Sequence, residues 1–371
     1  MKLSANKAEL LRLLDTASSV ITDNKIRPVI SCVLFETQEG ILKATGTDLD
    51  VTVNVISEVC EIIESGSCAI QPALITAYLK SIDNAVVVFT ASEGRASISI
   101  DDEVTAEFET MDWEDYPQMK NISEGEKVEL NRADFMRNIK RVRFAAFQDS
   151  SNVALNVIEM SQRQKLLTFA ATNSFMMCVS ELEVKEPSDY KINIPLKTID
   201  AIMKMLEKSN DDSVILQYCG NRIYIEFDSV KLTARLCELP FAQVTAILQD
   251  AKLGKTVKIQ CVSDELLKKC KTAILFASNS VSGKNGVICD FTGQKLHIKA
   301  VGAGKCNERV NIIKDGVDLK ISLNVAFLAD YLKNTDERVV TIHARDRKTM
   351  IYCHTDSENY KLIMMPLAIS E

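Results

Sequence analysis

A long amphipathic segment that occurs three times is the feature that most constrains how this chain folds. The clearest copy spans residues 132–147, and related copies span residues 5–20 and 263–277. Apolar residues recur in each copy at the spacing of one helix face. They are Leu10, Leu14 and Ala17; Phe135, Ile139, Val142 and Ala146; and Leu267, Cys270, Ile274 and Ala277. Equivalent positions lie 125 and 131 residues apart, so each repeating unit has the size of a domain.

The rest of each unit repeats in the same order. A second helix is predicted at 72–82, at 195–208 and at 323–334. Alternating segments separated by Gly-containing or polar turns predict antiparallel strands. These are 31–36, 41–45, 51–56, 86–90, 96–100 and 104–110; 154–160, 166–170, 214–218 and 223–227, with a turn at 161–164; and 286–291, 296–300, 339–344 and 349–354. The predicted class is α+β, with two helices packed on antiparallel sheets in each of three tandem domains.

Two polar, turn-rich segments without periodicity separate the units. Residues 117–127 and 248–256 are typical of short linkers between domains. We therefore expect domains at 1–122, 123–252 and 253–371.

Composition narrows the class of protein. The 371 residues contain no run of about 18 apolar residues, and the first residues do not resemble a secretory signal. Eleven scattered cysteines without a CxxC pair are typical of reduced, packed thiols. We expect a cytoplasmic protein that does not enter membranes.

Charge is unevenly distributed. The six predicted helices contain fifteen basic and eight acidic residues, although the whole chain has a net charge of −7. On the central helix Arg137, Lys140 and Arg141 lie opposite the apolar face. One interpretation is a solvated helix surface; the other is a basic surface that meets phosphate while the strands and loops stay acidic.

Several motifs resemble those of the bacterial DNA polymerase III beta subunit, the family of DNA sliding clamps. They are residues 1–14 (MKLSANKAELLRLL), 45–51 (TGTDLDV), 171–173 (ATN), 323–325 (LNV) and 364–367 (MMPL). The resemblance extends over the full length. Two segments differ from the family pattern: Ser174–Met177 replaces Gly-His-Arg-Leu, and Phe241–Val244 replaces Phe-Pro-Asp-Tyr. We therefore expect a divergent member.

The resemblance implies a function. Two copies would close head to tail into a ring, each forming half of it, with the helices around duplex DNA and the sheets outside. Such a clamp is a non-catalytic subunit of a polymerase holoenzyme and binds no cofactor or metal. Its partners would be double-stranded DNA without regard to sequence, a second copy of itself, the polymerase III alpha subunit, the clamp loader and other replication or repair proteins. The alternative is a clamp-like protein that binds partner peptides without encircling DNA.

A sliding clamp needs phosphate contacts spread over many cations, because such contacts carry no sequence information. The predicted DNA-binding residues are Lys25, Arg27, Lys80, Arg137, Lys140, Arg141, Lys197, Lys204, Lys268, Lys271 and Lys333, with Gln148 added from the family position that it resembles. We expect Arg137, Lys140 and Arg141 to contribute most.

The resemblance also implies two protein-binding surfaces. At the dimer interface Phe108, on the strand 104–110, would face Ile274 and Leu275 of the other copy. A cleft for short apolar peptides would be lined by Leu155, Thr172, Phe175, Met176, Met177, Ala242, Ile247, Asn324, Phe327, Ile363, Met364, Met365, Pro366 and Leu367. Its methionines predict an adaptable apolar surface. Because the family's His and Arg are missing there, we expect a shifted or relaxed preference for partner motifs.

Enzymatic sites have little support in the sequence. The three histidines, His297, His343 and His354, fall in predicted strands without acidic or cysteine residues at ligand spacing. We expect structural roles for them.

Overall fold

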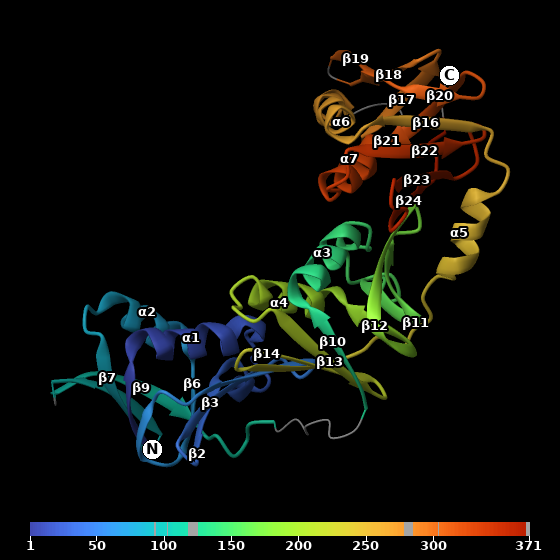
Figure 1. Ribbon diagram of the computed structural model, residues 1–371. Helices are drawn as coiled ribbons and strands as arrows, with labels where there is room; N and C mark the ends of the chain where they lie inside the picture. Colours follow the sequence, from blue (N-terminus) through green and yellow to red (C-terminus); the bar gives the residue numbers. More distant parts are fainter. Residues whose placement is uncertain (93, 102, 118–124, 278–284, 303, 369–371) are drawn as a thin grey trace. The chain divides into compact units, whose positions relative to one another are not determined.

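The structure is a computed structural model that describes residues 1–92, 94–101, 103–117, 125–277, 285–302 and 304–368 (Figure 1). It confirms the α+β class, with strands that pair antiparallel throughout the described part. The chain forms two compact units: residues 1–133 with 197–236, and residues 134–196 with 237–371. The expected domain limits stay a prediction, and residue 122 lies outside the described residues.

The first unit is built on one long sheet. Its strands, in spatial order, are β10 (Glu126–Asn131), β13 (Ser213–Cys219), β14 (Arg222–Phe227), β15 (Val230–Arg235), β4 (Val51–Ser57), β3 (Ile41–Thr47), β2 (Val33–Gln38), β6 (Ser67–Ile70), β9 (Glu103–Met111), β8 (Arg95–Ile100), β7 (Val86–Ser92), β1 (Lys2–Asn6) and β5 (Glu61–Glu64). Two short 3-10 helices, η1 (Ser18–Val20) and η2 (Pro28–Ser31), precede β2.

Helices α1 (Lys7–Ala17) and α2 (Pro72–Ser81) lie side by side in this unit, and α1 packs on β3 and β4 (Figure 1). Helix α4 (Leu196–Leu206) belongs to it from residue 197 onward. The Asn6 side chain caps α1 by accepting the backbone N–H of Ala8 at 2.9 Å, so the helix starts later than predicted. The predicted apolar face of α1 is confirmed and also includes Leu13.

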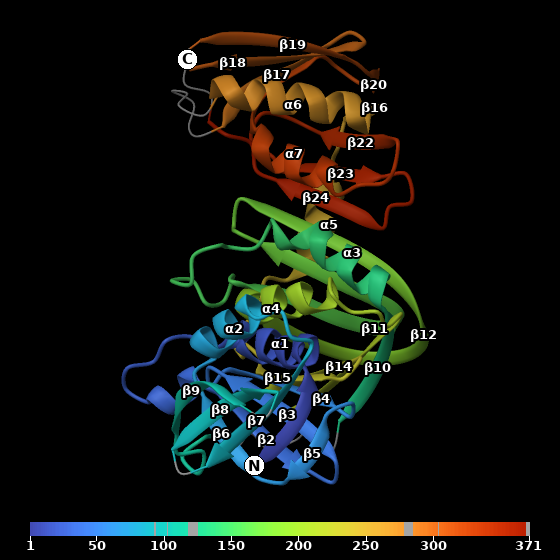
Figure 2. The ribbon, with the colours of Figure 1, turned by 90° about the vertical axis from the view of Figure 1, so that its left-hand side faces the viewer.

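The second unit contains two sheets. The seven-stranded sheet has the order β11 (Val157–Thr172), β12 (Met176–Pro195), β24 (Tyr360–Met364), β23 (Ile351–Thr355), β22 (Val339–Ala344), β16 (Val257–Val262) and β20 (Ile313–Asp315). The four-stranded sheet has the order β19 (Lys305–Asn311), β18 (Lys295–Val301), β17 (Gly286–Thr292) and β21 (Leu319–Asn324). Its helices are α3 (Arg132–Arg143, from residue 134), α5 (Val244–Lys252), α6 (Ser263–Ala277) and α7 (Val325–Lys333). Helix α6 lies between β17–β19 and α7 (Figure 2).

Three expectations about this unit were wrong. The stretch 248–256 is only partly a linker, because α5 extends to Lys252 and buries Val244 and Ala251. No turn interrupts 161–164: β11 continues beside β12, with only a register shift between Gln164 and Leu166.

The buried face of α6 also differs from its predicted face. It is formed by Ser263, Leu266, Cys270, Ala273 and Ala277, whereas Leu267 and Ile274 are only half-buried. By contrast, the apolar face predicted for α3 is fully buried.

The eleven cysteines are free, and eight of them are buried. Burial raises the pKa of the Cys32 thiol to about 11, so these side chains pack as small neutral hydrophobes.

Candidate functional site

The TGTDLD motif folds into a tight turn between β3 and β4. The Thr47 hydroxyl donates to the Val51 carbonyl at 3.0 Å, and one oxygen of Asp48 accepts the N–H groups of Asp50 and Val51 at 3.0 and 2.8 Å. Leu49 adopts a left-handed conformation with φ of 78°. The side chains of Thr47 and Asp48 therefore replace backbone hydrogen bonds that the turn cannot make.

The ATN motif forms the same turn between β11 and β12. The Thr172 hydroxyl donates to the Met176 carbonyl at 2.6 Å, and Asn173 accepts the N–H groups of Phe175 and Met176, both at 3.0 Å. Ser174 holds the left-handed position with φ of 74°. This correspondence, atom for atom, supports the repeat that the sequence indicated. It also gives Thr172, at 6% exposure, a role in the turn rather than on an open surface.

The second oxygen of Asp48 forms an ion pair with Lys197, at the start of α4. The Asp48 side chain is buried and that of Lys197 is about half exposed. Lys197 therefore lies over the turn, and its amine is partly neutralised before any phosphate approaches it.

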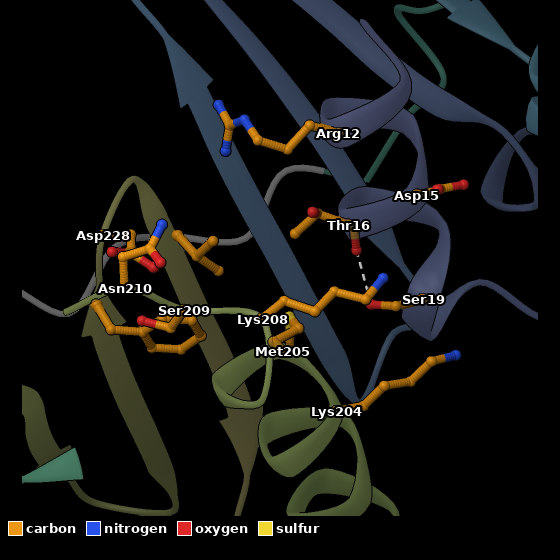
Figure 3. Close-up of a pocket in the computed structure, with 12 residues that line it drawn as sticks. Arg12, Asp15, Thr16, Ser19, Lys204, Met205, Lys208, Ser209, Asn210 and Asp228 are labelled. Carbon is orange, nitrogen blue, oxygen red and sulfur yellow. Dashed lines mark hydrogen bonds between the residues drawn. The ribbon is translucent and has the colours of Figure 1, made fainter. Parts of the chain in front are cut away.

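Cations from α1 and from the end of α4 surround a pocket of about 320 Å³ in the first unit (Figure 3). Figure 3 shows Lys208 extending from the segment after α4 toward Ser19, with Lys204 one turn earlier. Arg12 also lines the pocket and forms an ion pair with Glu9 at 2.8 Å. Asp15 and Asp228 are among the lining residues as well, so the pocket combines basic and acidic side chains.

The other predicted DNA-binding residues of the first unit are exposed. Lys80, in the last turn of α2, lies 3.5 Å from Asp15, a weak surface pair. Lys25 and Arg27 lie in the loop between η1 and η2, where the Asn24 side chain accepts the N–H of Arg27 at 2.9 Å and fixes the backbone.

In the second unit Arg137, Lys140, Lys268, Lys271 and Lys333 are all exposed. Arg137 pairs with Asp134 at 2.6 Å. Gln148 is exposed as well; its amide donates to the Ala146 carbonyl at 2.6 Å and accepts from Arg143 at 2.9 Å, and it therefore holds a fixed orientation.

Arg141 is a correction. Its side chain is 6% exposed, its guanidinium carbon lies 4.9 Å from the centre of the Tyr360 ring, and one nitrogen lies 3.8 Å from Asp336. The Tyr360 hydroxyl also donates to the Arg141 carbonyl at 2.9 Å. Arg141 therefore joins α3 to β24, and the prediction that it contributes most to DNA contact is wrong because it is covered.

The segment after β24 is held at two points by backbone hydrogen bonds. The N–H of Met365 donates to the Phe175 carbonyl at 2.9 Å, and that of Leu367 donates to the Ser322 carbonyl at 2.8 Å. Phe175 is 63% exposed at the tip of its turn, and Met365 is 41% exposed. The ATN turn and residues 364–367 are thereby brought together, as the partner site requires.

A core cluster lies beneath this region. It contains Val157, Ala170, Met177, Val179, Phe241, Val244, Ala251, Tyr352 and Ile363, and the half-buried residues packed against it are Leu155, Cys237, Ala242, Ile247, Leu248 and Met350. The structure thus brings together five predicted cleft residues: Leu155, Met177, Ala242, Ile247 and Ile363. Asn324, Phe327, Pro366 and Leu367 are half-buried.

The methionines are a second correction. Met176, Met177 and Met364 are at most 5% exposed, so only Met365 of the four is at the surface. The cover from α5 and Phe241 accounts for the burial of Met177. Met176 and Met364 pair directly across β12 and β24 and point to the opposite face of the sheet. The sequence did not reveal that Phe241 lies beneath the site. It also did not reveal Tyr352, which lies on β23, or Met350, which immediately precedes that strand. The spacing of Val244, Leu248 and Ala251 was the signal for α5.

The predicted dimer surfaces lie on β9 in the first unit and on helix α6 in the second. Phe108 is a correction, since it is only 7% exposed and packs edge to face on Tyr78 with ring centres 5.9 Å apart. Val104, 60% exposed, is the apolar residue that β9 presents. On α6, Leu275 is 76% exposed and Ile274 is half-buried.

His343 and His354 contact each other through their Nε2 atoms at 3.1 Å. Nδ1 of His354 lies 2.8 Å from the Thr355 carbonyl, which can only accept, so the proton is on Nδ1 and His343 donates through Nε2. Within the described residues no three His, Cys, Asp or Glu side chains gather as metal ligands would. None of the helices in the described part is long and apolar enough to span a membrane.

Solved structures with this fold cover the whole chain. A DNA polymerase III beta subunit from Eubacterium rectale superposes with a TM-score of 0.92 at 20% identity, covering 100% of both chains. The sliding clamp of Bacillus subtilis gives 0.92 at 18%, and that of Pseudomonas aeruginosa bound to griselimycin gives 0.90 at 19%, again with full coverage of both. The fold is that of the DNA polymerase sliding clamps.

Sequence comparisons agree. The family model for the DNA polymerase III beta subunit, N-terminal domain, matches residues 1–120, and that for the central domain matches residues 129–243. Together they cover more than half of the chain. The beta sliding clamps of Chlamydia pneumoniae and Haemophilus influenzae are 23% and 21% identical, each aligned over 100% of both chains. The chain belongs to the family of DNA polymerase III beta subunits.

Proposed function

We propose that this protein is a DNA sliding clamp: a non-catalytic, cytoplasmic processivity factor of three domains that encircles duplex DNA and tethers a polymerase and other replication or repair proteins. The observation that carries the proposal is the exposure of the helix cations in an acidic protein. Of the eleven predicted DNA-binding cations, every one except Arg141 is exposed, and they are spread over five helices and one loop.

Such a distribution suits sliding. Many weak phosphate contacts hold the protein near DNA, yet none of them depends on the base sequence. Several of these cations already have a carboxylate neighbour, as Lys80, Arg137 and Lys197 do. Each individual contact is therefore weak, and retention must depend on closure of a ring around the duplex.

Ring closure is proposed between β9 of one copy and β19 with α6 of another. Strand β9 pairs with β8 through Glu103–Glu109 and with β6 through Thr110 and Met111, while β19 pairs only with β18 among the described strands. The β9 sequence is acidic, with Glu103, Glu107 and Glu109, whereas β19 carries Lys305 and Arg309. Opposite charges on two incompletely paired strands favour head-to-tail pairing of identical chains.

The partner site is proposed over the half-buried residues beside Phe175 and Met365. A short apolar segment, such as one from the polymerase alpha subunit or a clamp loader, would pack there. The apolar rim formed by Leu155, Ala242 and Ile247 supports this, as does the anchored segment after β24. The departures in the ATN turn give this chain an aromatic tip at Phe175, so the preferred motif should be shifted.

Retention on circular DNA tests the main proposal. Protein loaded on a nicked plasmid by its clamp loader should co-elute with the plasmid on gel filtration, and cutting the plasmid once should release it. Equal retention on both forms would indicate ordinary binding. Absence from both forms, combined with binding of the apolar peptide, would favour the alternative, a clamp-like protein that binds partners without encircling DNA.

A further inference from the structure

Two lysines contact the edge of the apolar cluster beneath the proposed partner site. The Lys252 amine, at the end of α5, lies 5.3 Å from the centre of the Tyr352 ring. The Lys255 amine donates to the Met350 carbonyl. Because Tyr352 belongs to the cluster and Met350 packs against it, positive charge begins where the apolar surface ends.

One row of directly paired residues crosses the seven-stranded sheet from the apolar cluster to Lys258. Met177 on β12 pairs with Ile363 on β24, Ile363 with Tyr352 on β23, Tyr352 with His343 on β22, and His343 with Lys258 on β16. Directly opposite residues point to the same face of a sheet. Met177, Ile363 and Tyr352 are each only 3% exposed, so the row gives the separation of its two ends and is not itself the binding surface. Four steps of about 4.8 Å give roughly 19 Å, which an extended peptide of about six residues spans.

More cations gather at the Lys258 end of the row. Nη1 of Arg345 lies 3.1 Å from where a Cβ on Gly254 would be, so Arg345 lies over the turn before Lys255. Burial, His354 and Lys258 lower the pKa of His343 to about 4, so His343 is neutral near pH 7 and adds no charge. The cationic end of the row is thus formed by Lys255, Lys258 and Arg345.

The acidic residues nearby only partly offset these cations. Asp346 lies 3.8 Å from Nε of Arg345, but its Oδ1 also accepts the N–H groups of Lys348 and Thr349, at 2.7 and 2.8 Å. Glu358 lies 3.9 Å from Lys252, and Asp315 pairs across the sheet with Lys258. Lys258 and Arg345 remain exposed and available to a ligand.

We propose that the partner segment bound at the apolar rim continues into a short acidic stretch that crosses the surface above this buried row and ends over Lys255, Lys258 and Arg345. The inference rests on the proposed partner site and adds the chemistry of its occupant. The anionic ligand is a peptide rather than nucleic acid, because the cations adjoin an apolar surface. That surface would bury the apolar side chains next to the acidic stretch in the same peptide.

Fluorescence anisotropy with three labelled peptides tests the proposal. All three peptides carry the same family-type motif, a Gln followed by apolar and aromatic residues. The first peptide adds four acidic residues before the motif, and the second adds them after it. The third, neutral peptide adds Asn and Gln at both ends. In 50 mM salt one acidic peptide should bind about tenfold more tightly than the neutral one, as expected for a few exposed ion pairs. The advantage should fall below about twofold at 0.5 M salt.

The double variant Lys258→Glu/Arg345→Glu should abolish that advantage and leave the affinity of the neutral peptide within twofold. The matched control is Arg163→Glu/Lys165→Glu, which reverses two exposed cations in the middle of β11 and should preserve the advantage. Thermal melting confirms that both variants fold.

Equal affinity of all three peptides overturns this inference and leaves the partner site intact. No binding of any peptide overturns both the inference and the partner site. Displacement of the acidic peptide by a single-stranded oligonucleotide at equal charge, with the same loss in the double variant, would assign the cations to nucleic acid and also overturn it.

Discussion

Substitution of Leu275 by Lys should open the ring. Leu275 is 76% exposed, although it is a large apolar side chain in a long helix. Burying a leucine fully contributes about 1.5–3 kcal/mol, so covering three quarters of it contributes about 2 kcal/mol. A closed ring of two copies contains the contact twice, and its loss should weaken dimerisation by about 4 kcal/mol, or roughly a thousandfold in Kd.

Sedimentation velocity between 0.1 and 10 µM measures this effect directly. The unmodified protein should sediment as a dimer, and Leu275→Lys should sediment as a folded monomer with an unchanged melting temperature. Leu253→Lys is the matched control, since Leu253 is 67% exposed but lies between α5 and β16. It should stay dimeric. A Leu275→Lys protein whose Kd is within threefold of the unmodified value would refute the placement of the interface on α6.

Three further predictions concern other parts of the chain. Arg137→Glu with Lys140→Glu should lower the salt dependence of DNA binding, measured as the slope of log K against log salt, by about 1.8; an unchanged slope would remove α3 from the DNA surface. Asn173→Ala removes the acceptor of two N–H groups at 3.0 Å and should lower the free energy of unfolding by about 1–2 kcal/mol in urea titrations, while Asn173→Asp should not. Because folding lowers the pKa of His343 from 6.5 to about 4, the unfolded chain binds a proton at this histidine at a higher pH than the folded chain does. Its stabilising contribution is therefore full above pH 6.5 and falls as pH drops toward 4, by less than the full shift implies because solvent screens the half-buried ring; His343→Gln should flatten that part of the stability profile, and identical profiles would contradict it.

The sequence pattern predicted the buried face of a helix correctly where the apolar residues fitted only one face. The stripe of Phe135, Ile139 and Val142 identified the buried face of α3. In α6 the run of adjacent leucines allowed two faces about 100° apart, and packing against β18 and β19 selected the one with Leu266 and Ala273. Helix α5 was missed because its polar residues and Gly254 resembled a linker.

The site was less predictable because its main contacts are distant in sequence. Arg141 looked like part of a solvated basic stripe, yet Tyr360, 219 residues further on, covers it. Phe108 is covered by Tyr78 in the same way. The partner region was predicted from the resemblance alone, and burial of Met176 and Met364 follows from pairing between β12 and β24 that alternation alone does not specify.

Strand β24 also has a consequence for how the protein is made. It inserts between β12 and β23 in the seven-stranded sheet, although it follows β12 by more than 160 residues in the chain. A ribosome therefore releases both neighbouring strands before the strand that joins them, and β12 presents an unpaired edge while the more than 160 residues that separate it from β24 are made. Closing that gap must wait for a contact of very high sequence separation, which is slow to form. A nascent chain consequently lacks the surface of the proposed partner site until its synthesis has passed residue 364.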